Sequence, residues 1–437
     1  MILDILFGLV GLAGLVGIAF LFSQNRRKID WRLVGIGLLL QLIFALFVLK
    51  VPGGEDVFNL ISRFFVTLIN FTFEGAAFVF GILSSQEQME QLLPVEMKNL
   101  GFAFIFAFQV LPTIIFFSSL MSVLYHLGIM QKVVEGMARV MAKTMRVSGS
   151  ESLSVAANVF IGQTEAPLVI RPYIATMTQS ELLTLMVGGM ATIAGGVLAA
   201  YVSILGGTDL QSQIMYAKHL LSASIMAAPA TMVIAKILMP ETEKSETKDH
   251  VKIKVEKKTV NVIDAAATGA ADGLKLALNV GAMLLAFISI IAMFNYILES
   301  LGDVSGINSL IGNPLNLNLI LGYLLAPLAW LIGVPWGDTT QVGALIGQKI
   351  VINEFIAYLE LGKMIKLDML SDKAIIISTY ALCGFANFSS IAIQIGGIGG
   401  IAPNRRTDLA RFGIRAVLGG SLATLMTATI AGVLISL

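Results

Sequence analysis

Residues 159–167, with the sequence VFIGQTEAP, decide how this chain is built, because they place polar and helix-breaking residues inside an apolar run. Gly162 permits a tight turn, and Pro167 has no backbone N–H to donate to a helix. Within a bilayer, irregular backbone survives only where protein or a water-filled cavity surrounds it. The stretch is therefore predicted to form the tip of a helical hairpin at membrane depth.

The composition indicates that lipid is the solvent of most of the chain. Of 437 residues, 56% are hydrophobic and only 13% are charged, whereas soluble domains average about 25% charged residues. So little polar surface cannot cover a globule in water, and the fold class is predicted to be an all-α polytopic membrane protein. The net charge of +1 argues against a nucleic-acid partner.

Catalytic and metal-cluster chemistry find little support in the sequence. Cys383 is the single cysteine, and His126, His219 and His250 are too scattered to form a metal site or to activate a nucleophile. The sequence has no nucleotide-binding fingerprint. We therefore expect no enzyme activity and no organic cofactor.

Eight stretches have the length of about 20 apolar residues that a membrane-spanning helix needs. They are residues 2–22, 34–51, 100–126, 181–205, 214–238, 276–298, 374–395 and 416–437. Four more stretches are apolar but interrupted, at 58–83, 152–177, 315–334 and 341–361. The first stretch lacks a basic flank and is followed at once by the second, so it is interpreted as a retained helix and not as a signal peptide.

The basic residues predict the topology. They cluster after the first, third, fifth and seventh of these spans, at residues 26–32, 132–146, 244–258 and 405–415. All four clusters fall on the cytoplasmic side if 152–177 and 341–361 are re-entrant hairpins. The pattern predicts eight crossings plus two such hairpins, with both termini on the non-cytoplasmic side. Residues 241–258 are expected to form a solvated connector, and 133–145 an interfacial helix.

The two hairpins indicate an internal duplication. Residues 162–166 have a counterpart in 352–356, and 188–194 have one in 383–389. Under the predicted topology the halves have inverted orientation, a known plan for secondary transporters with discontinuous helices. The predicted division is 1–100 (peripheral and scaffold helices), 101–150 (scaffold span and interfacial helix), 151–240 (first repeat), 241–335 (charged loop and scaffold span) and 336–437 (second repeat).

Two acids inside apolar segments are the first candidates for a binding site. Glu165 follows an amide and a hydroxyl, which is typical of a ligand-reading cluster, although pairing with Arg171 is an alternative. Glu354 lies in a stretch without another charge up to Glu360, and its carboxylate suits the vicinal hydroxyls of a sugar. A salt bridge to Lys349 is the alternative there, which the five-residue spacing disfavours.

Neutral polar residues mark the remaining candidates. Asn387 and Ser390 are three residues apart, so one helical turn presents both to the same space. Phe385 beside them either stacks on a flat ring or packs as an ordinary apolar side chain. Asn158 and Thr192 place side-chain oxygens near the ends of two broken helices, where transporters commonly coordinate Na⁺.

At these residues the chain resembles the concentrative nucleoside transporter family in its short bacterial form. The strings that carry the resemblance lie at 162–168, 353–358 and 383–390, and their order and spacing fit nearly the whole chain. The resemblance implies a homotrimer in which each protomer has a scaffold domain and a transport domain that moves like an elevator. It also implies import of nucleosides driven by a cation gradient.

The same resemblance implies roles for single residues. Three are implied to read the nucleobase, namely Gln163, Thr164 and Glu165, with Val197 next to it. Three are implied to bind the ribose hydroxyls, namely Glu354, Asn387 and Ser390, with Phe385 lining the pocket. The implied Na⁺ ligands are the side chains of Asn158 and Thr192 and the carbonyls of Ile161 and Ile193.

The prediction for function is a Na⁺ symporter that imports uridine or a related nucleoside across the bacterial inner membrane. A proton-coupled importer on the same scaffold is the nearest alternative, because either Glu165 or Glu354 offers a proton carrier. An intramembrane enzyme and a passive channel are the alternatives from other classes. The sequence offers no activated nucleophile for an enzyme. A passive channel predicts no accumulation of substrate.

Overall fold

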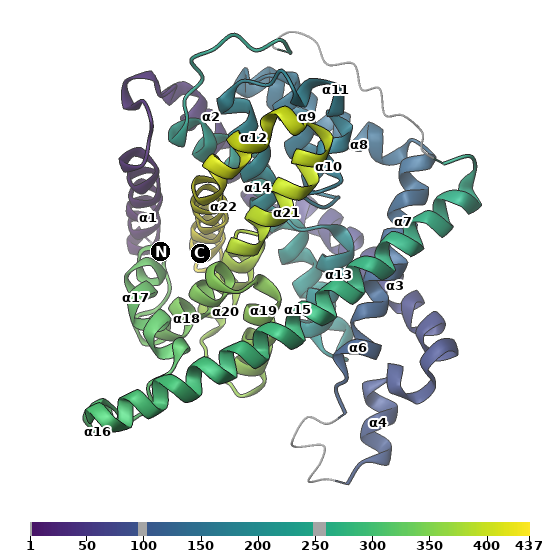
Figure 1. Cartoon of the computed structure of the whole chain (residues 1–437), viewed down its shortest axis with the longest axis vertical. Helices are drawn as coiled ribbons and strands as arrows, with labels where there is room; N and C mark the ends of the chain where they lie inside the picture. Colours follow the sequence, from purple (N-terminus) through teal and green to yellow (C-terminus); the bar gives the residue numbers. More distant parts are fainter. Residues whose placement is uncertain (1, 95–102, 248–258) are drawn as a thin grey trace.

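The computed structural model describes residues 2–94, 103–247 and 259–437, and every regular element in these ranges is a helix (Figure 1). Eight helical stretches in them are long and apolar enough to cross a membrane. These are Ile2–Leu21, Trp31–Leu49, Pro52–Leu92, Phe106–His126, Gln179–Gly206, Leu210–Leu238, Val262–Ser305 and Pro403–Ile435. The chain is therefore a multi-pass membrane protein.

Two segments that the sequence predicts to be interrupted are largely continuous helices in the structure. Residues 58–83 are predicted to be interrupted, yet 58–80 belong to one helix, α3 (Pro52–Phe80), and only 81–83 lie in the short 3-10 helix Gly81–Ser84 that follows it. The polar residues Arg63 and Glu74 do not break α3, because they lie on its exposed face. Residues 315–334 likewise contain a single helix, α17 (Leu317–Leu331), with Pro327 inside it. Interruption of the apolar sequence therefore does not mean interruption of the helix at these two places.

The predicted span 374–395 is divided into α20 (Asp372–Leu382) and α21 (Phe388–Ile401). A similar break at Thr192–Ala194 separates α12 (Gln179–Ala191) from α13 (Gly195–Gly206). Both breaks lie in the small-residue and polar stretches that the sequence matched as a repeat. They leave free helix ends inside the molecule.

Two further interruptions lie at the predicted hairpin tips. The first separates α9 (Gly149–Asn158) from the short helices α10 (Ala166–Val169) and α11 (Arg171–Ile174). The second is the short break between α18 (Thr339–Val351) and α19 (Glu354–Lys366). At 1.5 Å per residue these helices are only about 6 to 20 Å long, less than the thickness of a bilayer core.

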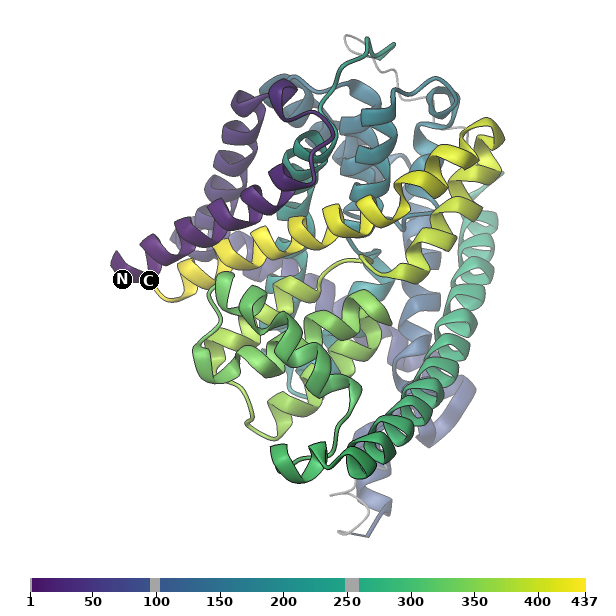
Figure 2. The same ribbon diagram turned by 60° about the vertical axis from the view of Figure 1, so that its left-hand side comes forward.

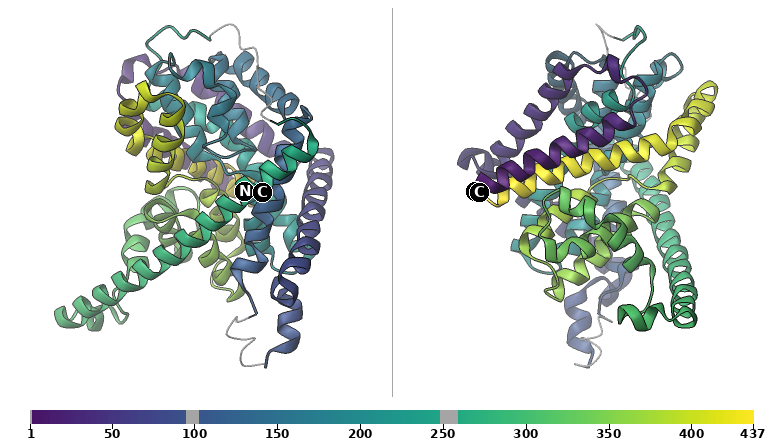
Figure 3. Two further views of the ribbon diagram at one scale, coloured as in Figure 1. Left: turned by 45° about the vertical axis from the view of Figure 1, so that its right-hand side comes forward. Right: turned by 90° about the vertical axis from the view of Figure 1, so that its left-hand side faces the viewer.

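The helices divide into a buried body and an exposed surround. The most apolar windows of α12–α13, α14 (Leu210–Leu238) and α22 (Arg406–Ile435, in the span from Pro403) are 83–89% buried. The window of α15 (Val262–Ser305) is only 17% buried. Figures 1 and 3 show α15 running along the outside of the molecule, where it packs on α7 (Leu111–His126) through a stripe of small residues. The broken helices therefore lie inside a layer of lipid-facing helices.

The first and last helices are neighbours. Helix α1 (Ile2–Leu21) lies along α22, and both chain ends lie at the same edge of the molecule (Figure 2). Gly8 allows the close approach to α22, because a Cβ there would overlap Val433, and Gly11 allows close approach to α17, because a Cβ there would overlap the carbonyl of Leu331.

The charged run 241–258 lies within the described residues only as far as 247, and this part is not simply solvated. Thr247 is buried, and its carbonyl accepts from the backbone N–H of Gly149 at 3.0 Å. The Ser245 hydroxyl donates to Glu181 at 2.5 Å. The predicted helix 133–145 belongs to α8 (Ile129–Met145), where Val134 is buried but Val133 and Val140 are exposed. Its buried face is therefore narrower than predicted.

Candidate polar site at the helix breaks

Asparagine caps start two helices at the breaks. Asn353 begins α19, where its side chain accepts from the N–H of Ile356 at 3.0 Å. Asn387 begins α21 in the same way, accepting from the N–H of Ser390 at 2.8 Å. An asparagine N-cap satisfies a free N–H in the first turn, so a helix can begin inside the apolar body. The first cap also fixes Glu354 as the first residue of α19.

The Glu354 carboxylate is held at both of its oxygens. The hydroxyl of Tyr201 donates to Oε1 at 3.0 Å, and the side-chain amide of Asn387 donates to Oε2 at 2.8 Å. Glu354 is only 3% exposed. A buried charged group needs such donors, and both are neutral here. Residues of α13, α19 and the α20–α21 break are therefore joined at one carboxylate.

Lys349, the alternative partner of Glu354, is bonded elsewhere. Its Nζ donates to the carbonyl of Ala381 at 2.7 Å and to Oγ1 of Thr424 at 2.9 Å. Within the described ranges, Lys349 and Glu354 do not form an ion pair. The carboxylate therefore has no cationic partner within ion-pair distance in this part of the chain.

Gln163 connects the first hairpin tip to the second half of the chain. Its side-chain amide donates to Oγ of Ser390 at 3.1 Å, while its oxygen accepts from the amide of Gln394 at 3.0 Å. Gly189 of α12 leaves space for this pairing, because a Cβ there would lie 2.8 Å from the Gln394 amide nitrogen. Gln394 also donates to the carbonyl of Met186 at 3.0 Å. The interruption between α9 and α10 is thus fixed against α21.

The other predicted site residues surround these hydrogen bonds without joining them. Thr164 lies against Gly397 of α21, and Val197 is buried in α13. Phe385 lies at the α20–α21 break and packs against the core while remaining half-buried. Glu165 is exposed, and its carboxylate lies next to Gly162. Among the described residues, Glu165 does not form an ion pair with Arg171, which was the alternative role for it.

Four oxygens near the ends of α9 and α12 are suited to a small cation. Asn158 is 1% exposed, and neither its amide oxygen nor its amide nitrogen has a hydrogen-bond partner. The Thr192 hydroxyl donates to Gly188 O at 2.9 Å, which leaves its lone pairs free. The carbonyls of Ile161 and Ile193 accept no hydrogen bond from any residue that the structure describes. Uncharged oxygens without donors fit Na⁺, which takes oxygen ligands at the ends of broken helices.

Two residues of the hydrogen-bonded cluster were not foreseen. Tyr201 is four residues after Val197 in α13, and Gln394 is four residues after Ser390 in α21. Residues four apart share a helix face. That spacing was the available signal, but a tyrosine or glutamine in an apolar helix has many other uses.

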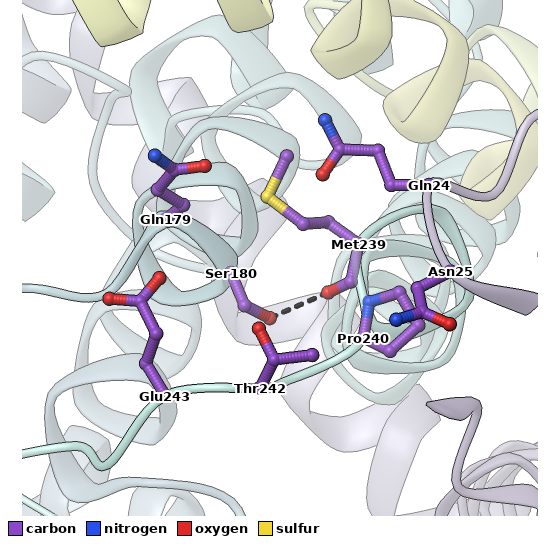
Figure 4. Close-up of a pocket in the computed structure, with 8 residues that line it drawn as sticks. All are labelled: Gln24, Asn25, Gln179, Ser180, Met239, Pro240, Thr242 and Glu243. Carbon is purple, nitrogen blue, oxygen red and sulfur yellow. Dashed lines mark hydrogen bonds between the residues drawn. The ribbon is translucent and has the colours of Figure 1, made fainter. Parts of the chain in front are cut away.

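A surface pocket of about 280 Å³ lies elsewhere, at the ends of α1, α12 and α14. Figure 4 shows its lining, in which the Ser180 hydroxyl donates to the carbonyl of Met239 at 2.6 Å. A second pocket of the same volume lies beside Lys373 and Gly432. Neither pocket includes a residue of the polar cluster. The side chains of the cluster instead hydrogen-bond to one another.

Broken helices that meet at a buried polar cluster, inside a multi-pass membrane protein, define a membrane transporter. Three family models agree with this class and divide the chain between them. The Na⁺ dependent nucleoside transporter N-terminus matches residues 10–83, the nucleoside recognition gate 107–208, and the Na⁺ dependent nucleoside transporter C-terminus 219–432. The chain therefore belongs to the concentrative nucleoside transporter family, and it is a transporter and not an enzyme.

Individual relatives support the same assignment. The chain is 46% identical to the uncharacterized transporter YutK of Bacillus subtilis, over 99% of this chain and 100% of that protein. It is 40% identical to the nucleoside permease NupC of Helicobacter pylori, over 100% and 99% of the two chains. It is 41% identical to the sodium/nucleoside cotransporter 1 of Mus musculus, over 98% of this chain and 64% of the mouse protein.

Solved structures of one transporter, CNTnw, have the same fold. The inward-facing substrate-bound state of CNTnw matches with a TM-score of 0.89 and 45% identity, over 98% of this chain and 99% of that chain. A variant of CNTnw in an outward-facing state matches with a TM-score of 0.88 and 44% identity, over 99% and 98% of the two chains. The fold is thus similar to that of a transporter whose structure is solved in both inward-facing and outward-facing states.

Proposed function

We propose that this chain imports nucleosides, uridine among them, across a bacterial inner membrane by symport with Na⁺. The observation that carries the proposal is the polar cluster in which the two hairpin tips and the α20–α21 break meet. A carboxylate accepts two hydrogen bonds from neighbouring hydroxyls, and a side-chain amide both donates and accepts. A nucleoside offers both partners, a ribose with adjacent hydroxyls and a base with donors and acceptors on its edge.

The proposed roles divide between the two halves of the chain. Three residues bind the ribose hydroxyls, namely Glu354, Asn387 and Ser390. Gln163, Thr164 and Glu165 contact the base, while Val197 and Phe385 pack beside it. Support comes from the pairing of Gln163 with Ser390 and of Asn387 with Glu354. A nucleoside placed there exchanges these internal hydrogen bonds for its own, so binding leaves few buried polar groups unsatisfied.

The proposed coupling ion is Na⁺, held by the oxygens of Asn158, Ile161, Thr192 and Ile193. Their lack of hydrogen-bond donors supports this choice over proton coupling through Glu165 or Glu354. A proton carrier needs a side chain that titrates, whereas a Na⁺ site needs only oxygens with free lone pairs.

The proposed cycle is an elevator movement of an inverted-repeat transport domain, formed by 151–240 and 336–437, against the remaining helices. The short helices at both tips support re-entrant hairpins, because neither helix of α18–α19 can reach across a bilayer core. The basic clusters support a non-cytoplasmic position for both termini. Similarity to inward-facing and outward-facing structures supports the movement.

The test is uptake of labelled uridine by proteoliposomes that contain the purified chain. We expect accumulation above the outside concentration with an inward Na⁺ gradient, and little uptake when choline replaces Na⁺ at fixed pH. Undiminished uptake in choline that follows an imposed pH gradient would support proton coupling instead. Equilibration without accumulation under either gradient would support a passive channel, and no uptake would contradict the nucleoside assignment.

A further inference from the structure

Five glutamate and lysine side chains are buried in the described part of the chain, and they form two groups. Glu151, Glu181 and Lys236 form the first group, at the starts of α9 and α12 and near the end of α14. Lys236 pairs with Glu151 there and with Glu241 at 3.4 Å. This group lies beside the exposed residues 241–244 and holds its own cation in direct contact with carboxylates.

The second group consists of Lys349 and Glu354, which stand on either side of the break between α18 and α19. Lys349 is 1% exposed. The Thr424 hydroxyl donates to Ser421 O at 3.0 Å, so its oxygen acts as an acceptor towards Nζ of Lys349. The other acceptor, Ala381 O, belongs to the last turn of α20, where the helix dipole favours a cation. Its surroundings therefore suit an ammonium group.

Neither charge of this second group is neutralised by direct contact. Lys349 is bonded to a carbonyl and a hydroxyl, and Glu354 to a hydroxyl and an amide. Yet the two belong to one packed unit, because α18 packs on both α19 and α20. If this unit moves as a body, both charges move with it, so removing either one changes the charge that crosses the membrane by one.

We propose that Lys349 is a fixed counter-charge to Glu354, so that this buried pair adds no net charge to the moving body when it crosses the membrane without cargo. The inference rests on the proposed Na⁺ symport and elevator movement. The two buried charges sum to zero without cargo and to +1 with one Na⁺ and a neutral nucleoside. An unbalanced charge is costly to move through a bilayer, and its movement depends on voltage. The return of the empty body therefore carries no added energetic cost and no added voltage dependence from this pair.

The charge-removing variant is Lys349→Gln, whose amide still donates to Ala381 or Thr424. Lys349→Arg keeps the charge, and Lys363→Gln removes the charge of an exposed lysine that pairs with Glu360 on α19. Without the Lys349 charge this pair contributes −1 when the body is empty and, together with one Na⁺, zero when it is loaded. The voltage-dependent step then changes from the loaded crossing to the empty return, while the net charge per nucleoside remains one.

The experiment compares uridine exchange, which needs only loaded crossings, with net uptake, which needs the empty return. Both are measured in proteoliposomes at membrane potentials set by a potassium ionophore. In the wild type and in Lys363→Gln, we expect the exchange rate to respond to voltage. In Lys349→Gln, exchange becomes insensitive to voltage, and the ratio of exchange to net uptake rises about tenfold or more. One charge across 100 mV biases the two orientations by up to about fifty-fold, so the difference is measurable.

Exchange by Lys349→Gln that keeps the wild-type voltage response would overturn the inference. Equal loss of exchange and net uptake in a folded variant would also overturn it, since Lys349 would then serve the loaded state as much as the empty one. If Lys349→Gln and Lys349→Met both fail to fold, the lysine acts only as a structural tie, with the same consequence. The proposed function is judged by wild-type uptake alone, whereas this inference is judged by the difference between variant and wild type.

Discussion

The carboxylate of Glu354 has neutral donors at both oxygens, and this determines the effect of replacing it. In Glu354→Gln, one oxygen becomes an amide nitrogen that cannot accept from Tyr201 or Asn387. Hydrogen bonds to a charged group contribute about 1.5 to 3 kcal/mol each, so losing one of them weakens ribose binding by about tenfold to a hundredfold. Uridine uptake by Glu354→Gln is therefore expected to fall to the background of empty liposomes.

A matched control for this variant is Glu360→Gln on the same helix, where the acid pairs with Lys363 near the surface. Its uptake is expected to equal that of the wild type. Both variants should elute from a sizing column as the wild type does. Normal uridine uptake by a folded Glu354→Gln chain would remove this residue from the proposed ribose site.

Thr192 offers a second test at the residue scale. Thr192→Val removes one of four proposed Na⁺ ligands while keeping the shape of the side chain. We expect the Na⁺ concentration for half-maximal uptake to rise about tenfold, equivalent to about 1.4 kcal/mol. Thr192→Ser keeps the oxygen and should behave as the wild type.

Thr184→Val on the same helix removes a buried hydroxyl that donates to Ser180 O at 2.9 Å, and it controls for loss of a structural hydrogen bond. An unchanged Na⁺ dependence in Thr192→Val would count against the proposed ligand set. An equal change in both variants would assign the effect to helix packing.

Residue chemistry explains what was predictable about the site. Glu354 stood out because a charge inside an apolar stretch is costly without a purpose. Its hydrogen bond to Asn387 agrees with the prediction that both residues belong to one site. Tyr201 was missed because a membrane-helix tyrosine is usually interpreted as packing, and only the fold brings α13 to α19. The sequence likewise does not reveal that Lys349 turns away to α20 and α22.

At the scale of helices, the packing of α17 against α18 depends on two glycines. A Cβ at Gly343 would lie 2.6 Å from the carbonyl oxygen of Gly322 and 2.9 Å from the backbone nitrogen of Ala326. Backbone atoms cannot move aside as a side chain can. Gly343→Val is therefore expected to destabilise the protein by at least about 2 kcal/mol, seen as a lower unfolding temperature in detergent.

Gly136→Val is the matched control for that variant, because Gly136 lies in α8 with open space around its Cα. Valine and glycine differ little in helix preference compared with the expected clash, and glycine is the poorer helix former. The unfolding temperature of Gly136→Val should remain close to that of the wild type. Equal stability of Gly343→Val and the wild type would mean that α17 and α18 separate readily.

Helix boundaries were predictable where the sequence carried helix-breaking chemistry. Pro167, Gly162 and the capping residues Asn353 and Asn387 mark the interruptions of the buried body. The continuity of α3 was not predictable from apolar runs, because its polar residues follow a helical face and not a break. Amphipathic periodicity was the better signal there.

At the scale of the whole molecule, the exposed apolar surface of α15 is a candidate contact for the homotrimer that the family resemblance implies. Leu278, Leu285 and Tyr296 are 62–74% exposed on this helix. Lipid covers such a surface as well as protein does, so assembly must be measured directly. We expect light scattering in detergent, corrected for bound detergent, to give three times the chain mass of 46.7 kDa. A mass of one chain that persists in lipid nanodiscs would contradict the trimer.

The contact between α1 and α22 also bears on how the protein is made. All the main packing partners of α1, namely α14, α17 and α22, follow it by about two hundred residues or more. During synthesis the first helix enters the membrane with its small-residue face uncovered, and its longest contact waits until residues 406–435 emerge from the ribosome. Pairing between such distant segments is slow to form and exposes intermediates to misassembly. A chain that stalls before its final helix therefore leaves its first one without its main neighbour, which gives the quality-control proteases of the membrane a feature to recognise.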